Sequence, residues 1–172
     1  MKKILYLSIA LALISQTSKS QELRPYQFIQ FFKVYQLENS IHLLSGTECL
    51  KGYDKQWMFI EAFTVIGNTE DMHFWAYGAD NSKQFIHKVS GSTNKVTGNH
   101  YIEYEFNEPH LYQQYLTQIT NMNGEDGGVS KVGGGTGHIY NVGGLTFVLR
   151  TFPAGIKDEN VVYTIALTED KK

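Results

Sequence analysis

The sequence predicts an α+β fold dominated by strands, as an antiparallel sheet or partly closed barrel of about seven strands with two helices near 26–37 and 109–121. Short apolar segments separated by turn residues fill most of the chain from Trp57 onward. Two segments with helical spacing stand apart from them, each with proline at its start. No linker, charge run or repeat marks a boundary, so residues 21–172 are expected to form one domain.

The chain begins with the pattern of a secretory signal peptide over residues 1–20. Lys2 and Lys3 precede an apolar run of 11 residues, and the small residues Ser18 and Ser20 favour cleavage after position 20. A membrane-spanning helix needs roughly 20 apolar residues, so this run is too short to serve as an anchor. We therefore expect a secreted or periplasmic protein with no lipobox cysteine and no membrane insertion after cleavage.

Charge and cysteine content narrow the classes of partner. The chain has 15 basic and 17 acidic residues, and the signal peptide removes three lysines and no acid, which leaves a net charge of about −5. A mildly acidic surface whose only arginines are Arg24 and Arg150 is a poor match for nucleic acid. The single Cys49 excludes an intramolecular disulfide, and burial, a bridge to another chain or a reactive thiol all stay open for it.

The two helices are predicted from apolar spacing. In the first, four aromatic residues follow the i, i+3, i+4, i+7 pattern, namely Phe28, Phe31, Phe32 and Tyr35. A strand is the weaker alternative there, because aromatic residues also favour strands. The second helix opens at Pro109, and its apolar face comprises Leu111, Tyr112, Tyr115, Leu116 and Ile119.

Strands are predicted near Trp57–Ile66, Met72–Ala79, Gln84–Ser90, His100–Phe106, Ile139–Asn141, Leu145–Thr151 and Val161–Thr168. The polar segments 68–71, 80–83 and 91–94 are typical of tight turns, so the first four strands should pair as antiparallel hairpins. The last strand alternates cleanly, with Val161, Tyr163, Ile165 and Leu167 on one face.

The segment 121–144 holds nine glycines and is predicted to be a glycine-rich loop. A binding loop or lid is one alternative. The spacing fails both the phosphate-binding and the dinucleotide-binding patterns, because Gly134 stands where the first requires lysine. A calcium loop is a looser alternative, since Asn121, Asn123, Glu125 and Asp126 supply oxygen atoms but the glycine and glutamate of a helix-flanked calcium loop are missing.

The six histidines contain no metal-binding spacing, although His73 and His87 fall on adjacent predicted strands. A pairing that placed His73 beside residue 89 would make them diagonal neighbours, with Glu103 or Glu105 from the next strand as a third ligand. The alternative, which we favour, is that both histidines are polar members of an aromatic sheet face. No metal or cofactor is predicted.

Catalytic motifs are also lacking, and no catalytic residue is assigned. Cys49 beside Lys51 could act as a nucleophile only with a distant histidine. Glu103 and Glu105 share one strand face and could form a carboxylate pair, but the alternation with Ile102, Tyr104 and Phe106 favours a solvated face of a half-buried strand. Enzymatic activity therefore stays uncertain, with the balance against it.

Aromatic residues are abundant, at 10 Phe, 11 Tyr and 2 Trp. Both faces of the segment 72–77 carry aromatic side chains, which predicts either a ligand-binding face or cover by helices or sheet closure. The candidate ligand-binding residues are Trp57, Trp75, Tyr77, Tyr101 and Tyr104. We expect a non-enzymatic binding protein for an apolar ligand, a glycan or another secreted protein. The alternative is a secreted hydrolase or metal-dependent enzyme with its site near the glycine-rich loop.

Overall fold

The computed structural model describes residues 22–37, 43–65, 69–78, 87–132, 135–152 and 161–169. Three helices are present in these ranges: α2 (Pro25–Gln36), α3 (Leu43–Tyr53) and α4 (Pro109–Asn121). The strands are β1 (Trp57–Thr64), β2 (Glu70–Tyr77), β3 (Lys88–Asn94), β4 (His100–Phe106), β5 (Glu125–Val132), β6 (Gly135–Val142), β7 (Leu145–Phe152) and β8 (Val162–Glu169).

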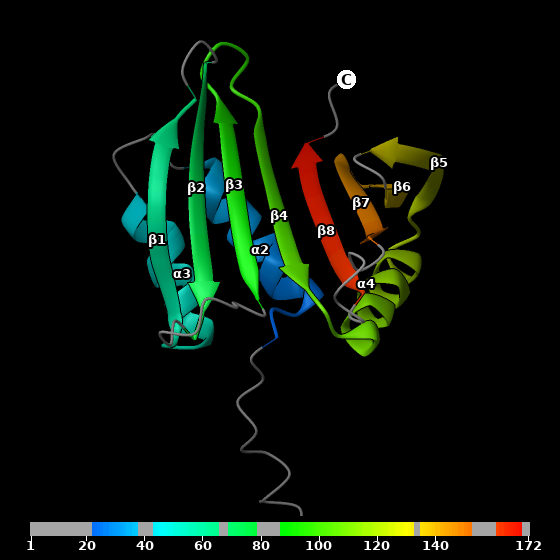
Figure 1. Ribbon diagram of the computed structural model, residues 1–172. Helices are drawn as coiled ribbons and strands as arrows, with labels where there is room; N and C mark the ends of the chain where they lie inside the picture. Colours follow the sequence, from blue (N-terminus) through cyan, green and yellow to red (C-terminus); the bar gives the residue numbers. More distant parts are fainter. Residues whose placement is uncertain are drawn as a thin grey trace, which may run out of the picture.

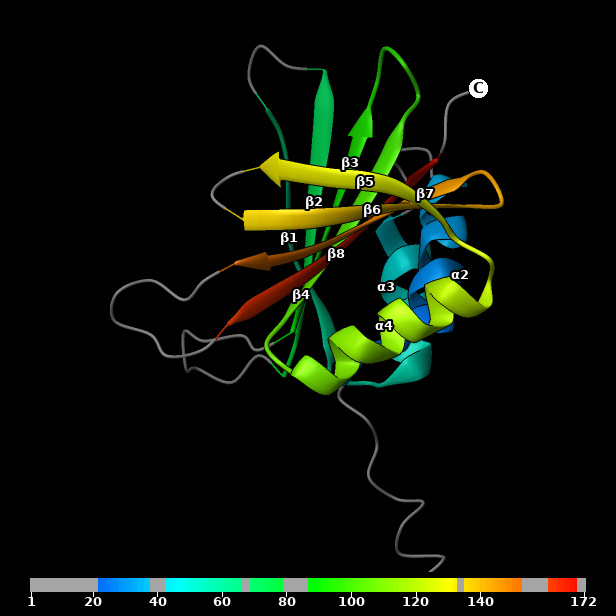
Figure 2. The ribbon, with the colours of Figure 1, turned by 90° about the vertical axis from the view of Figure 1, so that its right-hand side faces the viewer.

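The strands form one antiparallel sheet with the order β1-β2-β3-β4-β8-β7-β6-β5. The helices α2 and α3 precede a first four-stranded meander, β1 to β4, and α4 precedes a second, β5 to β8. The two meanders join where β4 pairs with β8. Figure 2 shows that β5 to β7 run across the direction of β1 to β3, so the sheet is strongly twisted. Because β1 and β5 are both edges, the sheet is open.

All three helices lie on one side of this sheet (Figures 1 and 2). Strand alternation therefore divides the sheet into two faces, and β4 shows the division clearly. Ile102, Tyr104 and Phe106 point toward the helices and are at most 1% exposed. We call this side the covered face; the opposite side, which carries Tyr101, Glu103 and Glu105 in β4, is the open face.

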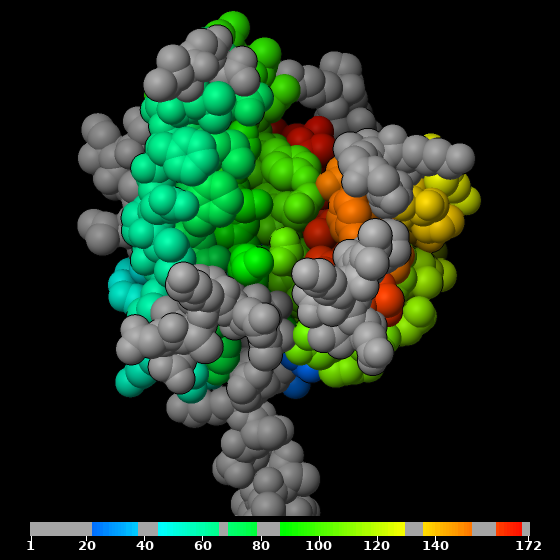
Figure 3. Space-filling view, viewed as in Figure 1, coloured from blue at the N-terminus to red at the C-terminus, as the bar shows by residue number. Residues whose placement is uncertain are grey.

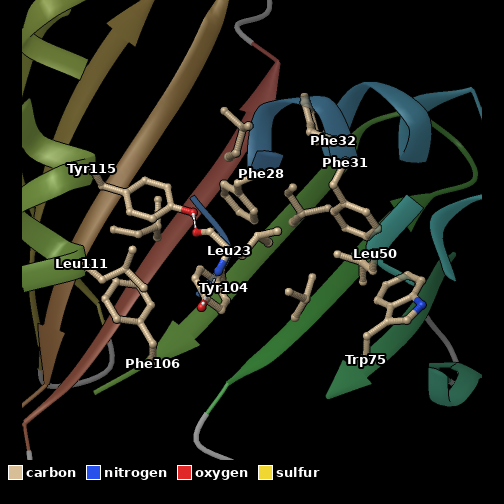
Figure 4. Close-up of a cluster of buried hydrophobic side chains, with 14 of the residues drawn as sticks. Leu23, Phe28, Phe31, Phe32, Leu50, Trp75, Tyr104, Phe106, Leu111 and Tyr115 are labelled. Carbon is tan, nitrogen blue, oxygen red and sulfur yellow. Dashed lines mark hydrogen bonds between the residues drawn. The ribbon is translucent and has the colours of Figure 1, made fainter. Parts of the chain in front are cut away.

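The core lies between the covered face and the helices (Figure 4). Phe28 of α2 is fully buried, with its ring centroid 6.1 Å from that of Tyr104 in β4 and 6.0 Å from that of Tyr115 in α4. Phe31 packs edge-on against Trp75 at 5.3 Å. Burying large aromatic side chains contributes most of the stabilisation of a core without disulfides.

The α+β class with an antiparallel sheet is confirmed, with differences in detail. The helices expected near 26–37 and 109–121 are α2 and α4, and the strand His100–Phe106 has the expected bounds. The sheet has eight strands and is open, not a partly closed barrel. The sequence reasoning missed α3, because Gly46 and Gly52 weaken its helical pattern.

The structure corrects the prediction of a glycine-rich loop at 121–144. Most of this segment forms the paired strands β5 and β6, with α4 ending at Asn121. Glycine serves the pairing directly: the register shifts between Asp126 and Gly128, and Gly128 has φ of +94°, which side-chain-bearing residues rarely adopt. Two of the glycines thus serve the bulge of an edge strand, and Gly143 and Gly144, both with positive φ, form the turn between β6 and β7.

Two of the predicted turns fall wholly or partly within strands in the structure. Residues 91–94 belong to β3, and the chain reverses after Asn94, whose side-chain oxygen accepts hydrogen bonds from the backbone N–H groups of Val96 and Thr97, both at 3.0 Å. Glu70 and Asp71, expected in a turn, open β2. The turn predicted at 80–83 and the start of the strand at 84–86 lie outside the described residues, as does the signal peptide at 1–20.

Candidate functional site

Four of the five candidate ligand-binding aromatics lie on the covered face. Their side chains are between 0% and 7% exposed, namely Trp57, Trp75, Tyr77 and Tyr104. Trp75 also donates a hydrogen bond from Nε1 to Oγ1 of Thr47 in α3 at 3.0 Å. A ligand could reach these residues only by displacing a helix. The structure therefore places them in the core, as the alternative of helix cover anticipated.

The histidines His73 and His87 share the covered face but are not diagonal neighbours. The register pairs His73 with Gly91, while the backbone N–H of Tyr77 bonds to the carbonyl of His87, so His87 lies four residue pairs along the ladder from His73. Glu103 and Glu105 point to the opposite face. Within the described residues, no group of three or more His, Cys, Asp and Glu side chains could hold a metal ion.

Each buried histidine belongs to a tyrosine network. Tyr104 accepts a hydrogen bond from the backbone N–H of Leu23 at 3.1 Å, and its hydroxyl is hydrogen-bonded to Nδ1 of His87 at 2.6 Å. Nε2 of His87 lies 3.3 Å from the carboxylate of Glu108. Burial lowers the pKa of His87, against the opposing effect of Glu108. A neutral His87 thus holds the Tyr104 side chain in place within the core.

His73 is held in a similar way by helix α2. Its Nδ1 lies 2.8 Å from the hydroxyl of Tyr35, and burial lowers the pKa of His73. The ring of Tyr35 lies directly over β3, because a Cβ atom at Gly91 would stand only 2.7 Å from Cζ of Tyr35. Glycine at this position lets the helix approach the sheet. The interpretation of His73 as a polar member of an aromatic face fits this geometry.

Tyr101 is the one candidate aromatic on the open face, and it belongs to a polar cluster there. Its hydroxyl donates a short hydrogen bond to Oε2 of Glu103, and Nη1 of Arg150 lies 2.7 Å from the same oxygen. Arg150 also donates to the Tyr101 hydroxyl at 3.3 Å. Burial, followed by the charge of Glu103, raises the pKa of Tyr101 well above its usual value, so the hydroxyl stays protonated.

The Arg150–Glu103 pair is partly withdrawn from water. The side chains of Arg150 and Glu103 are 16% and 24% exposed, and Nε of Arg150 is buried with no hydrogen-bond partner among the described residues. Arg150 stands opposite Thr164 on β8, so its side chain crosses that strand to reach β4. Sequence reasoning missed this pair, although Arg150 lies on the polar side of a strand whose alternate residues are Phe147 and Leu149.

A second ion pair lies beside the first on the open face. Lys88 of β3 contacts Glu105 at 2.9 Å, and the two side chains are 46% and 39% exposed. Glu103 and Glu105 do share one face, as the sequence indicated, but each carboxylate is paired with its own basic residue. This pairing leaves neither glutamate as an obvious general acid or base.

A groove of about 410 Å³ adjoins Tyr101 on the open face. Its floor is a cross-strand row over β2, β3, β4 and β8, formed by Met72, Ser92, Tyr101 and Thr168. The remaining lining residues are Glu70, Asn94, Asn99 and His100. Figure 3 looks onto this face, where β8 lies recessed between β4 and β7; the groove is toward the upper end of the sheet in this view. Its volume lies in the range of small-molecule sites.

Two other features of the described residues are a second groove, beside α4, and Cys49. A groove of about 450 Å³ between the start of α2 and the exposed side of α4 is lined by Arg24, Pro25, Tyr26, His110, Gln113, Gln114, Thr117 and Gln118. Cys49 is half-buried in α3, with its thiol 3.4 Å from the Tyr53 hydroxyl, and it forms no disulfide. Neither feature brings together charged groups withdrawn from water as the Tyr101 cluster does.

No protein-family model, curated protein sequence or solved structure matches this chain. Within the described residues, no helix is both long enough and apolar enough to cross a membrane. The case for a function therefore depends on the geometry of the chain itself.

Proposed function

We propose that this protein is a secreted or periplasmic, non-enzymatic binding protein that holds its ligand on the open face of the sheet. The observation that carries the proposal is the cluster of Tyr101, Glu103 and Arg150, set partly out of water on the face opposite the three described helices. The signal-like start of the chain supports the location.

The energetic argument concerns the ion pair. Withdrawing two charges from water costs roughly what their attraction returns, so a partly buried pair is weak evidence for a role in stability. A binding site, in contrast, uses a few fixed polar groups on a rigid scaffold to orient a ligand. The pair fixes the Tyr101 hydroxyl at the centre of an eight-stranded sheet, where β4 meets β8, and so fixes the position of its ring beside the groove.

The open face is also equipped with exposed apolar groups. Phe63 of β1 is 48% exposed and its ring stacks on that of Phe74 in β2 at 5.6 Å. Met72 lines the groove between these rings and Tyr101. A surface that combines apolar contact area with oriented polar groups is typical of ligand sites.

The test is native mass spectrometry of the protein recovered from the compartment to which its own host exports it. We expect the wild type to carry a bound mass, and Arg150→Met to lose it because Tyr101 is no longer fixed. Lys88→Met is the matched control, since it breaks the exposed ion pair on the same face and should keep the bound mass.

A second measurement uses Phe74→Trp in a background with Trp57 and Trp75 replaced by Phe, which puts a single fluorescent reporter on the open face. Extracts of the same compartment should change its emission. A wild type that carries no mass, together with a reporter that responds to no extract, would contradict the proposal.

A further inference from the structure

The groove beside Tyr101 offers both donors and acceptors of hydrogen bonds. Ser92, Asn99 and Glu70 make no hydrogen bond or ion pair to other described side chains. The Asn94 oxygen is occupied by the turn that follows β3, which leaves its amide N–H groups as donors. The imidazole of His100 lies instead toward the covered face, where Nδ1 is 3.2 Å from Thr93 and the ring packs against Tyr35 of α2. The ligand must therefore both donate and accept.

The charge of the groove excludes one class of ligand. Glu70 carries the only formal charge among its lining residues, because burial lowers the pKa of His100 and keeps the imidazole neutral near pH 7. Lys95, at the turn after β3, is paired with Asp71 at 2.8 Å. An anionic ligand would face a carboxylate with no cation on the lining to balance it. Phosphorylated and sulfated compounds are thus disfavoured.

The mixture of donors and acceptors argues against a cationic ligand. An ammonium group only donates hydrogen bonds, so it would satisfy Glu70 and leave the amide donors of Asn94 and Asn99 unpaired. Leaving such groups dehydrated and unpaired is unfavourable. A hydroxyl group both donates and accepts, and it suits every polar group in this lining.

The floor of the groove adds two apolar contacts. Met72 and Tyr101 flank Ser92 in the cross-strand row. The Tyr101 hydroxyl is committed to Glu103 and Arg150, so its ring is what Tyr101 can offer a ligand. A sugar ring has this same composition, with C–H groups on its faces and hydroxyls around its rim.

We propose that the groove binds a neutral saccharide, with its ring against Tyr101 and Met72 and its hydroxyls on Ser92, Asn94, Asn99 and Glu70. This inference rests on the open face being the binding face and names the class of ligand that the face accepts.

The experiment is saturation-transfer NMR on the exported protein with four probe sets. The neutral set contains oligosaccharides of glucose, galactose, mannose and N-acetylglucosamine; the others contain sialyllactose, heparin disaccharides and spermidine. We expect signal transfer to at least one neutral sugar and to none of the charged probes.

Ser92→Ala and Asn99→Ala should each weaken the affinity about three- to tenfold, the value of one hydrogen bond. Gln114→Ala, in the second groove, is the matched control and should change nothing.

The outcomes separate the two proposals. Sugar binding that is unaffected by Ser92→Ala and Asn99→Ala would overturn the assignment of the groove. Binding of only a charged probe, abolished by Ser92→Ala, would overturn the assignment of a neutral saccharide and leave the open face as a binding face. If the wild type binds no probe but carries a mass that Arg150→Met loses, the saccharide is again overturned and the open face remains a binding face. Failure of the NMR, mass and fluorescence measurements together would overturn both proposals.

Discussion

The two faces of the sheet are built from the same strands and carry opposite chemistry. Along β4, the covered-face residues Ile102, Tyr104 and Phe106 are at most 1% exposed, while Glu103 on the open face is 24% exposed and pairs with Arg150. On the covered face the polar atoms of His73 and His87 end on tyrosine hydroxyls that hold helices or the N-terminal segment in place. Polar contacts there complete the packing of the core.

On the open face the polar contacts hold no helix. Arg150, Glu103 and Tyr101 lie on strands that already pair through their backbones, so their side-chain bonds are not needed to join β4 to β8. The covered face therefore carries most of the packing that stabilises the fold, and the open face is the one that we propose for recognition. Substitutions on the two faces should separate these roles.

The largest expected effect is on the covered face. Phe31→Ala should destabilise the protein by about 3–5 kcal/mol, because the ring is fully buried against Trp75 and its removal leaves a cavity. Phe74→Ala, which removes the same ring from the open face, should cost about 1 kcal/mol or less, since Phe74 is only half-buried. Urea unfolding monitored by circular dichroism measures both, and equal losses would contradict the division of roles.

The sequence predicts much of the division of β4 residues between two faces, but it does not predict which face the helices cover. Alternation in the segment 101–106 correctly separates Ile102, Tyr104 and Phe106 from Tyr101 and the two glutamates. Alternation does not say where the helices pack. Aromatic content therefore assigned Trp75 and Tyr104 to a candidate ligand face, whereas α2 covers them. The choice between the faces is a tertiary property.

The polar cluster was beyond sequence reasoning for a different reason. Arg150 and Glu103 are separated by 47 residues, and they meet only because β8, the last strand, inserts between β4 and β7. No local spacing encodes that insertion. The glycine-rich segment was misread similarly, because among the described strands β5 pairs with β6 alone, and the glycines serve its bulge and the turn after β6. Long-range pairing decided both cases.

The next effect is the pH dependence of the covered face. Burial lowers the pKa values of His73 and His87 below the usual value of about 6.5, so the folded protein resists protons that the unfolded chain accepts. Stability should be level above about pH 6.5 and fall as the pH drops, by up to about 1.4 kcal/mol per unit for each histidine until its folded pKa is reached. Asp71 and Glu108 oppose the shifts and reduce the slope.

Urea unfolding midpoints between pH 8 and pH 5 measure this slope. Burial also lowers the pKa of His100, so three histidines contribute to the slope. His73→Gln should flatten the slope, because one of these three groups no longer titrates, even if the variant is less stable at every pH. The interval from pH 7 to pH 8 is the internal control, where the midpoints should agree. A slope that His73→Gln leaves unchanged would show that the covered face does not set the acid response.

The smallest expected effects come from the two ion pairs of the open face, and they test its role most directly. Arg150→Met should cost about 1 kcal/mol, because it leaves the partly buried charge of Glu103 without its basic partner, whereas Lys88→Met should cost less than that, since exposed pairs contribute little. The double variant Arg150→Met with Glu103→Gln removes both charges and should recover most of the loss in a thermal unfolding series. A face selected for stability would instead lose more with each substitution. If the double variant is as stable as the wild type and still fails to retain a ligand, the pair is kept for recognition, because the fold itself does not need it.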